Sequence, residues 1–296
     1  MRDMDATSRT TVDLALCHYG RGEYDAASRA YRRAVHLARQ EGDKAMGVRL
    51  MRLSALFYAP RRAVREITRA LEEARKHGIE QEMAFCHNDR GVALLTLQGF
   101  EPARADFQRS AQILEHSAET RNGAPWNNLG LLEILCGLPE EADGLLHEAF
   151  NRGGEPAVAE SVRGHQAILR AMRGDAGAAA AAFGTPSGDL ERAGNLAIRS
   201  RMAHNRARAL LLSGNPEEAW REATACPPER HLINDELIEG RRARLLLDIG
   251  AALGREPLQP GETERLQAQV RTLETSIHPQ AWFFRMPWAY CEVVFR

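Results

Sequence analysis

Apolar side chains recur every three or four residues along most of this chain, which is the spacing of one face of an α-helix. In PRRAVREITRALEEARK, residues 60–76, the apolar residues Ala63, Ile67 and Ala70 fall on one face and arginines occupy the others. Residues 262–276 have a similar amphipathic pattern. Because every strong periodic segment has helical spacing, the pattern predicts about two-thirds helix or more and no sheet.

A short motif returns along the chain. GLPEEA at residues 137–142 is followed, 77 residues later, by GNPEEA at 214–219. Related glycines stand one or two periods of 36–40 residues apart. They are Gly22, Gly99, Gly137, Gly174, Gly214 and Gly250, and YAPRRA at 58–63 fills the one slot without a glycine. A repeat of this length predicts seven copies of one supersecondary unit.

Each unit reads as a helix, a tight turn and a second helix. Glycine suits the end of the first helix because it tolerates a left-handed backbone. Pro60, Pro139 and Pro216 suit the first turn of the second helix, where a missing N–H costs nothing. The glutamates that follow two of these prolines place negative charge at the positive end of the helix.

Residues 125–150, PWNNLGLLEILCGLPEEADGLLHEAF, resemble a tetratricopeptide repeat (TPR) of the long-period type found in bacteria. The matching positions are Trp126, Leu129, Gly130, Gly137, Ala142 and Ala149, and other units contribute the pairs Ala27 and Tyr31, Ala103 and Phe107, and Ala179 and Phe183. The resemblance covers residues 8–254. It implies an all-α fold, a right-handed superhelical solenoid of about seven TPR-like hairpins with a C-terminal cap, in which Trp126, Leu129 and Ala142 are buried.

Residues 255–296 differ from the repeats. After the helix predicted at 262–276, the segment from Pro279 onward holds 6 of the 18 aromatic residues of the protein. We predict two domains, a TPR-like solenoid over 8–254 and a C-terminal helix with an aromatic capping segment over 255–296. A segment that binds a partner is the alternative interpretation of the aromatic tail.

The first helices of the units carry a column of polar residues. In this family the first helices usually line the concave groove, and an asparagine there often grips the backbone of a bound peptide. Aligning the units on Gly91, Gly130, Ala167 and Ala207 gives the candidate residues Asn88, Asn127, Asn128, His165, His204 and Asn205. An amide offers a donor and an acceptor, which matches one peptide unit. The alternative is that these side chains bond neighbouring helices.

Arginines are predicted on the same face. Arg49 and Arg52 in the second unit, and Arg208 and Arg244 further along, could each hold a carboxylate through two parallel bonds. The carboxylate clamp of the family, which grips the C-terminus of a peptide, is not reproduced, so we do not expect a free C-terminus as the ligand.

Charge and motifs limit the other functions. The formal net charge is −1, but residues 29–76 carry a net charge of +8. Binding of nucleic acid or a phosphate ligand by this segment is therefore an alternative function. A solvated outer helix face explains the charge more simply. Motifs of hydrolases, nucleotide-binding proteins and metalloproteases are missing. His87, His165 and His204 lie on separate repeats, about 10 Å apart per step, which argues against a shared metal.

The hypothesis is a non-catalytic scaffold, adaptor or regulator that binds a protein or peptide segment in the groove. A scaffold of this kind requires no cofactor or metal, and nucleic acid is not its expected partner. An enzyme with an unrecognised site is a further alternative. The N-terminus has no apolar signal segment and no apolar run approaches the roughly 18 residues of a membrane helix, so we predict a cytoplasmic protein with no membrane partner. The oligomeric state is left open.

Deleting residues 279–296 should lower the melting temperature and promote aggregation, because six aromatic side chains can bury several hundred Å² at about 25 cal/mol per Å². Thermal unfolding and sedimentation of residues 1–278 measure both effects. A truncated chain of unchanged stability that has lost a complex would instead support a tail that binds a partner.

Overall fold

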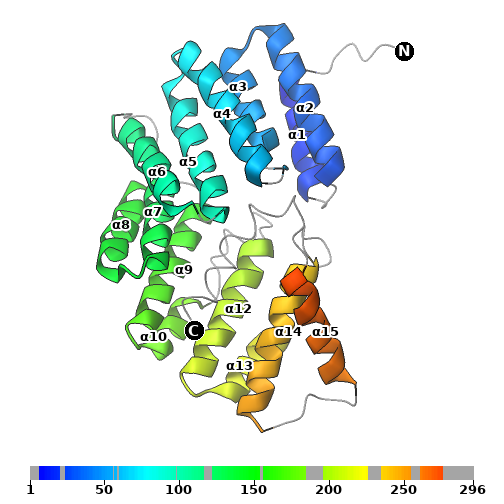
Figure 1. Cartoon of the computed structure of the whole chain (residues 1–296), viewed down its shortest axis with the longest axis vertical. Helices are drawn as coiled ribbons and strands as arrows, with labels where there is room; N and C mark the ends of the chain where they lie inside the picture. The colour runs from blue at the N-terminus through cyan, green and yellow to red at the C-terminus, as the bar shows by residue number, and fades with distance from the viewer. Residues whose placement is uncertain are drawn as a thin grey trace. The chain divides into compact units, whose positions relative to one another are not determined.

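The computed structural model describes residues 7–20, 24–55, 57–58, 60–97, 99–116, 122–153, 156–184, 196–225, 235–254 and 261–275. Within these ranges the chain forms fourteen α-helices and no strand (Figure 1). The expectation of an all-α fold is therefore confirmed. The predicted cap at residues 279–296 lies outside the described residues, and the division at residue 254 stays a prediction.

The helices follow one another as seven consecutive pairs in the described part of the chain. They are α1 (Ser8–Gly20) with α2 (Tyr24–Glu41), α3 (Lys44–Ala55) with α4 (Pro60–Lys76), α5 (Glu80–Thr96) with α6 (Phe100–Glu115), α7 (Ala124–Leu135) with α8 (Pro139–Arg152), α9 (Pro156–Met172) with α10 (Ala176–Ala182), α12 (Leu196–Leu212) with α13 (Pro216–Ala225), and α14 (Asp235–Ala252) with α15 (Glu262–Thr275). The pairs correspond to the seven predicted hairpins.

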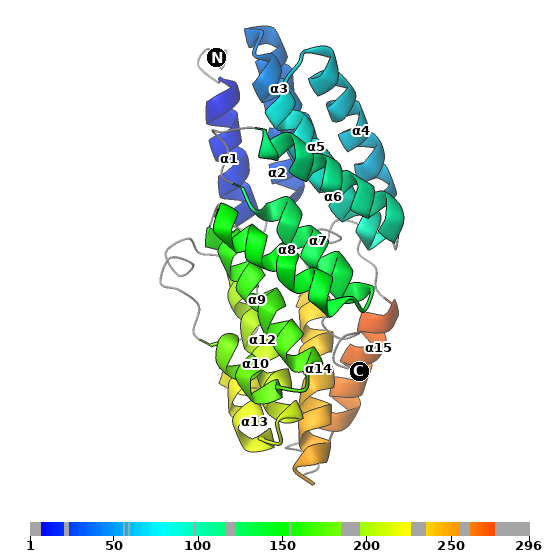
Figure 2. The same cartoon turned by 90° about the vertical axis from the view of Figure 1, so that its left-hand side faces the viewer.

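The helices divide between two compact units, one up to Leu129 and one from Gly130. In the first unit each helix from α1 to α6 contacts the next, and α3 also contacts α5 (Figure 2). In the second unit α12 contacts both α9 and α14. The first helices α3 and α5, and likewise α9, α12 and α14, are thus neighbours, which is the arrangement of stacked repeats.

The turns between paired helices follow the predicted chemistry at three glycines. Gly137, Gly174 and Gly214 have φ angles of 74°, 87° and 79°, in the left-handed region that favours glycine. The residue after each glycine donates its backbone N–H back into the preceding helix, at N···O distances of 2.9–3.0 Å. Pro139 and Pro216 begin the next helices, as predicted.

Two other glycines of the predicted series do something different. Gly99 has a φ angle of −84° and caps the start of α6, where a Cβ would lie 3.3 Å from both the Leu94 carbonyl and Pro102, so close packing selects glycine there. Gly250 lies inside α14, which ends at Ala252. The left-handed glycine after this helix is Gly254, with a φ angle of 61°. Helix-favouring residues after Gly250 extend α14 beyond the expected turn.

The hairpins are held by small residues facing bulky ones. A Cβ on Gly91 of α5 would lie 2.6 Å from the ring of Phe107 on α6, and one on Gly130 of α7 would lie 2.7 Å from Leu146 on α8. Trp126, Leu129 and Ala142, which the TPR resemblance implied to be buried, are buried. The paired motif residues of other units are buried as well: Ala27, Tyr31, Ala103, Phe107, Ala179 and Phe183. This packing sets the distance between the paired helices.

Gly91→Ala should destabilise the fold by about 1–3 kcal/mol, because the added methyl group overlaps the Phe107 ring and the ring has no flexible end to move. Gly144→Ala is the matched control, since nothing lies within 4 Å of its added Cβ in the exposed face of α8, and it should stabilise the protein by about 0.5–1 kcal/mol. Chemical denaturation measures both. If Gly91→Ala did not lower the free energy of unfolding relative to Gly144→Ala, the close contact between Gly91 and the Phe107 ring would be contradicted.

Candidate functional site

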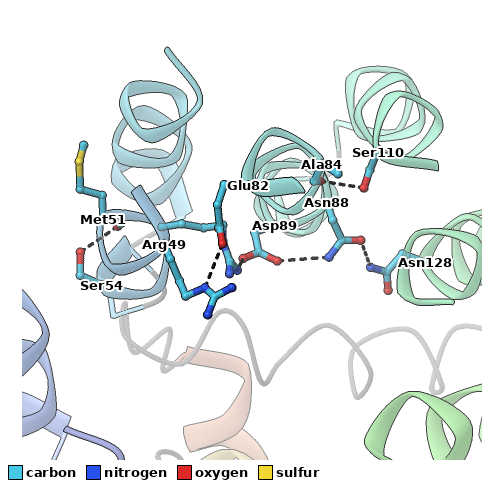
Figure 3. A network of polar contacts seen from close by, with 10 residues as sticks. Arg49, Met51, Ser54, Glu82, Ala84, Asn88, Asp89, Ser110 and Asn128 are labelled. Atoms are coloured by element: carbon cyan, nitrogen blue, oxygen red, sulfur yellow. Dashed lines mark hydrogen bonds and ion pairs between the residues drawn. The ribbon is translucent and has the colours of Figure 1, made fainter. Parts of the chain in front are cut away.

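A line of polar side chains crosses the first helices of three successive hairpins, α3, α5 and α7, within the first unit (Figure 3). We call it the first-helix network. Its members are Arg49 and Arg52 on α3, Glu82, Asn88 and Asp89 on α5, and Asn128 on α7. Each member is bonded to the next, so the line joins three hairpins.

The network begins with ion pairs between α3 and α5. Arg49 Nε donates to Glu82 Oε1 at 2.9 Å, and Arg52 Nε lies 3.4 Å from Glu82 Oε2. Arg52 Nη1 also donates to Asp89 Oδ2 at 2.5 Å. Two arginines and two carboxylates thus neutralise one another, which reduces the cost of placing charge at a helix interface.

Asparagines continue the line from α5 to α7. Asn88 Nδ2 donates to Asp89 Oδ1 at 3.2 Å, and Asn128 Nδ2 donates to Asn88 Oδ1 at 2.9 Å. Both asparagines are half-buried. They were predicted to face one surface, and the bond between them brings their amides together on that face.

Arg52 is the fixed centre of the network. Its side chain is only 12% exposed and its guanidinium lies 5.3 Å from the centroid of the Phe85 ring. Burial lowers the pKa of Arg52, but Asp89 and Glu82 outweigh burial and raise the pKa above its ordinary value. The guanidinium therefore stays charged, and removing either carboxylate leaves a buried charge with less compensation.

The predicted arginines have carboxylate partners within the chain. Arg49 and Arg52 were expected to offer their guanidinium groups to a ligand carboxylate, and both hold carboxylates of the chain itself. In the second unit Arg208 likewise donates to Asp248 at 2.7 Å, and Arg244 lies 3.7 Å from the same carboxylate. Acidic residues pair with these arginines, on the neighbouring first helix for Arg49, Arg52 and Arg208 and on the same helix for Arg244.

The predicted column of polar residues does not form one accessible surface. Asn127, His165 and Asn205 are 5%, 6% and 3% exposed, so the expectation of accessibility is wrong for these three. His204 is half-buried. Each of the four has an interaction within the protein. Neighbouring positions on a helix point about 100° apart, so aligned pairs such as Asn127 and Asn128 cannot both face outward.

A second network, which the sequence did not reveal, lies between α4, α5 and α6. Arg90 donates through Nε and Nη2 to both oxygens of Asp106, each at 2.7 Å, and through Nη1 to Thr68 Oγ1 at 3.3 Å. His87 Nδ1 lies 2.7 Å from Asp106 Oδ1. The sequence spacing could have indicated this network. Asp106 follows Ala103 by one helical turn and precedes Phe107, which places its carboxylate on the core-facing side of α6, where it needs a partner.

The Asp106 carboxylate is held charged by its partners. Its side chain is 7% exposed, and this burial raises its pKa, but hydrogen bonds from Arg90 and His87 outweigh burial and lower the pKa below its ordinary value. Both carboxylate oxygens are engaged, so Asp106 has the features of a structural ion pair.

The buried Cys86 thiol and the potential metal ligands are further groups to consider in the described part of the chain. Burial is the main cause that raises the pKa of Cys86 to about 12, so its thiol is not a nucleophile at neutral pH. Cys17 and Cys136 are exposed. Among the described residues no group of three His, Cys, Asp or Glu side chains could hold a metal ion.

Several arginines of the basic segment 29–76 have partners within the chain. Arg49 and Arg52 belong to the first-helix network, Arg69 pairs with Glu66 at 3.2 Å, and Arg62 lies 3.9 Å over the Tyr58 ring.

None of the helices in the described ranges is long and apolar enough to cross a membrane.

Comparisons with known proteins add little to this geometry. No family model matches the chain, and no curated protein matches it. One solved structure that it resembles is a tetratricopeptide repeat protein from Parabacteroides merdae, with a TM-score of 0.45 and 16% sequence identity, over 89% of this chain and 98% of that one. The all-α fold rests on the helices themselves, and TPR membership remains a prediction.

Asp106→Asn should destabilise the protein by about 3–5 kcal/mol at neutral pH, because it leaves the Arg90 guanidinium without its carboxylate. Because the folded pKa of Asp106 is lowered, its stabilisation is complete above the unfolded value of about 4 and is lost as the pH falls through the folded value. The difference between wild type and variant should therefore shrink below about pH 4.

Urea denaturation at several pH values tests this expectation. Asp143→Asn, which removes a half-exposed carboxylate paired with Arg173, is the matched control and should change stability little. A difference for Asp106→Asn that is small, or that stays constant down to acid pH, would show that the ion pair does not support the fold.

Proposed function

We propose that this protein is a non-catalytic scaffold that binds a peptide or an extended protein segment along the first helices of its hairpins, and so acts as an adaptor or regulator. The observation that carries the proposal is the bonded pair of half-buried amides, Asn88 and Asn128, on neighbouring first helices. The pair lies on one face with the exposed end of the network at Arg49.

The amides retain capacity for a ligand. The bond between them uses one donor hydrogen of Asn128, and within the described residues the Asn128 oxygen accepts no bond. A primary amide has two donors and an acceptor, which can pair with the C=O and N–H of a peptide unit. Two such groups on adjacent hairpins suit a segment that runs across the first helices.

The remaining candidates serve this face in different ways. Arg49 is the more accessible arginine of the first-helix network, whereas Arg52 holds Glu82 and Asp89 in place. Asn127, His165 and Asn205 are too buried to meet a ligand without movement and would position the helices instead. In the second unit, His204 and Arg208 remain separate candidates.

The chemistry of the network supports binding over catalysis. Its carboxylates are each paired with arginine, and no histidine or cysteine belongs to it. A general base needs an accessible group that can take a proton, and a carboxylate held by arginine is a poor one. A regulator of this kind would act through the protein that it binds.

The double variant Asn88→Ala/Asn128→Ala should weaken peptide binding about tenfold or more, since each lost hydrogen bond is worth about 1 kcal/mol. Folding should be little affected, because both partners of the Asn88–Asn128 bond are removed together and Asp89, which loses its bond from Asn88, keeps its ion pair with Arg52. Peptides selected from a random linear library on the wild-type chain provide ligands for calorimetric titration.

Asn151→Ala, on the exposed face of α8, is the matched control and should bind as the wild type does. If the selected peptides bind the double variant as tightly as the wild type, the recognition surface does not include Asn88 and Asn128. Binding of RNA or DNA that weakens steeply with salt would favour the alternative based on residues 29–76.

A further inference from the structure

The ion pair between Arg49 and Glu82 is unequal in exposure. The Arg49 side chain is 45% exposed, whereas that of Glu82 is only 2% exposed. They meet through one hydrogen bond of 2.9 Å from Arg49 Nε. The guanidinium can therefore leave for water at low cost, but the carboxylate cannot.

Glu82 is also held from its other side. Arg52, 12% exposed, approaches the second Glu82 oxygen at 3.4 Å and binds Asp89 at 2.5 Å. If Arg49 moves away, Glu82 keeps the charge of Arg52 beside it and stays in place. The structure thus contains a fixed carboxylate whose outer cation is replaceable.

We propose that Arg49 occupies the position of a cationic side chain of the bound segment, and that an arginine or lysine of the partner replaces it on Glu82. The inference rests on the proposed function and gives the chemistry of its partner. It reverses the sequence-based expectation that Arg49 itself captures a carboxylate.

Charge decides between the two directions of exchange. A ligand carboxylate that took Arg49 would lie near Glu82 and Asp89, and would separate buried Glu82 from one of its two cations. A ligand guanidinium replaces the Arg49 guanidinium with a group of the same charge and shape. Its planar set of N–H donors can form hydrogen bonds with the Glu82 carboxylate. The site therefore favours a cation.

The rest of the network gives this cation a defined place in the segment. Asp89 is bonded to Arg52 on one side and to Asn88 on the other, so the Glu82 carboxylate and the Asn88–Asn128 amides belong to one connected line (Figure 3). A peptide held through its backbone by the amides would extend its basic side chain toward α3.

Arg49→Gln is the deciding variant. It should tighten binding of selected peptides that contain arginine or lysine by about threefold or more, because the peptide no longer competes with an internal cation. The same peptide with its basic residue changed to glutamine should lose this gain. If Arg49 instead grips a ligand carboxylate, Arg49→Gln must weaken binding, so the direction of the change overturns or supports the proposal.

Arg173→Gln is the matched control. Arg173 is 40% exposed and pairs with Glu140 and Asp143 of α8, so it also loses an exposed ion pair on substitution. Its affinity for the same peptides should not change. An equal gain in both variants would assign the effect to overall charge and overturn the proposal.

Glu82→Gln provides a second readout. Peptides selected on this variant should no longer be enriched in arginine and lysine, whereas their dependence on Asn88 and Asn128 should persist. If this variant does not fold, the direction of the Arg49→Gln effect decides alone.

The two proposals fail in different ways. Peptides that depend on Asn88 and Asn128 but show no enrichment in basic residues overturn this inference and leave the proposed function standing. A selection that gives no peptide sensitive to the asparagine variants overturns both.

Discussion

The contact between a small residue on one helix and a bulky side chain on its neighbour sets the geometry on which every other interaction depends. Gly91 faces the Phe107 ring and Gly130 faces Leu146, at distances that leave no room for a methyl group. The paired helices are therefore close and in a fixed register. Between hairpins, the short side chains of Asn88 on α5 and Asn128 on α7 meet in a hydrogen bond.

Charge is distributed over this frame in compensated groups. Arg52 links two carboxylates in the first-helix network, and Asp106 links an arginine and a histidine in the second. Such groups add little net stability compared with apolar packing, but they tolerate few alternative arrangements. Their value here is that they specify which helix faces which, and they leave one cation, Arg49, at the accessible edge.

Local chemistry made much of the fold predictable from sequence. Pro139 and Pro216 begin helices, and Gly137 and Gly214 take left-handed turns, because these residue types have few other options. Gly250 shows the limit of the approach. A glycine spaced like a turn can also lie within a helix when the residues that follow favour helix, and only tertiary packing distinguishes the two.

The site was less predictable, for a reason that is geometric. Alignment placed Asn88, Asn127 and Asn128 in one polar column and matched Asn88 with Asn127, but it could not show that Asn127 is buried and that Asn128 is the residue that bonds Asn88. It also could not pair residues distant in sequence, so Glu82 was not recognised as the partner of Arg49 and Arg52. Charge partners across helices require the register, which comes from the packing of side chains in three dimensions.

The Arg90 side chain has a consequence for how the molecule opens. It lies on α5, bonds Asp106 of its own hairpin on α6, and also reaches Thr68 on α4 of the preceding hairpin. A helix that frays alone must release this shared group, so α4, α5 and α6 are bound into one cooperative unit. Amide hydrogens of these three helices would then exchange with solvent at a common rate, and the boundary between hairpins would not be a boundary of local unfolding.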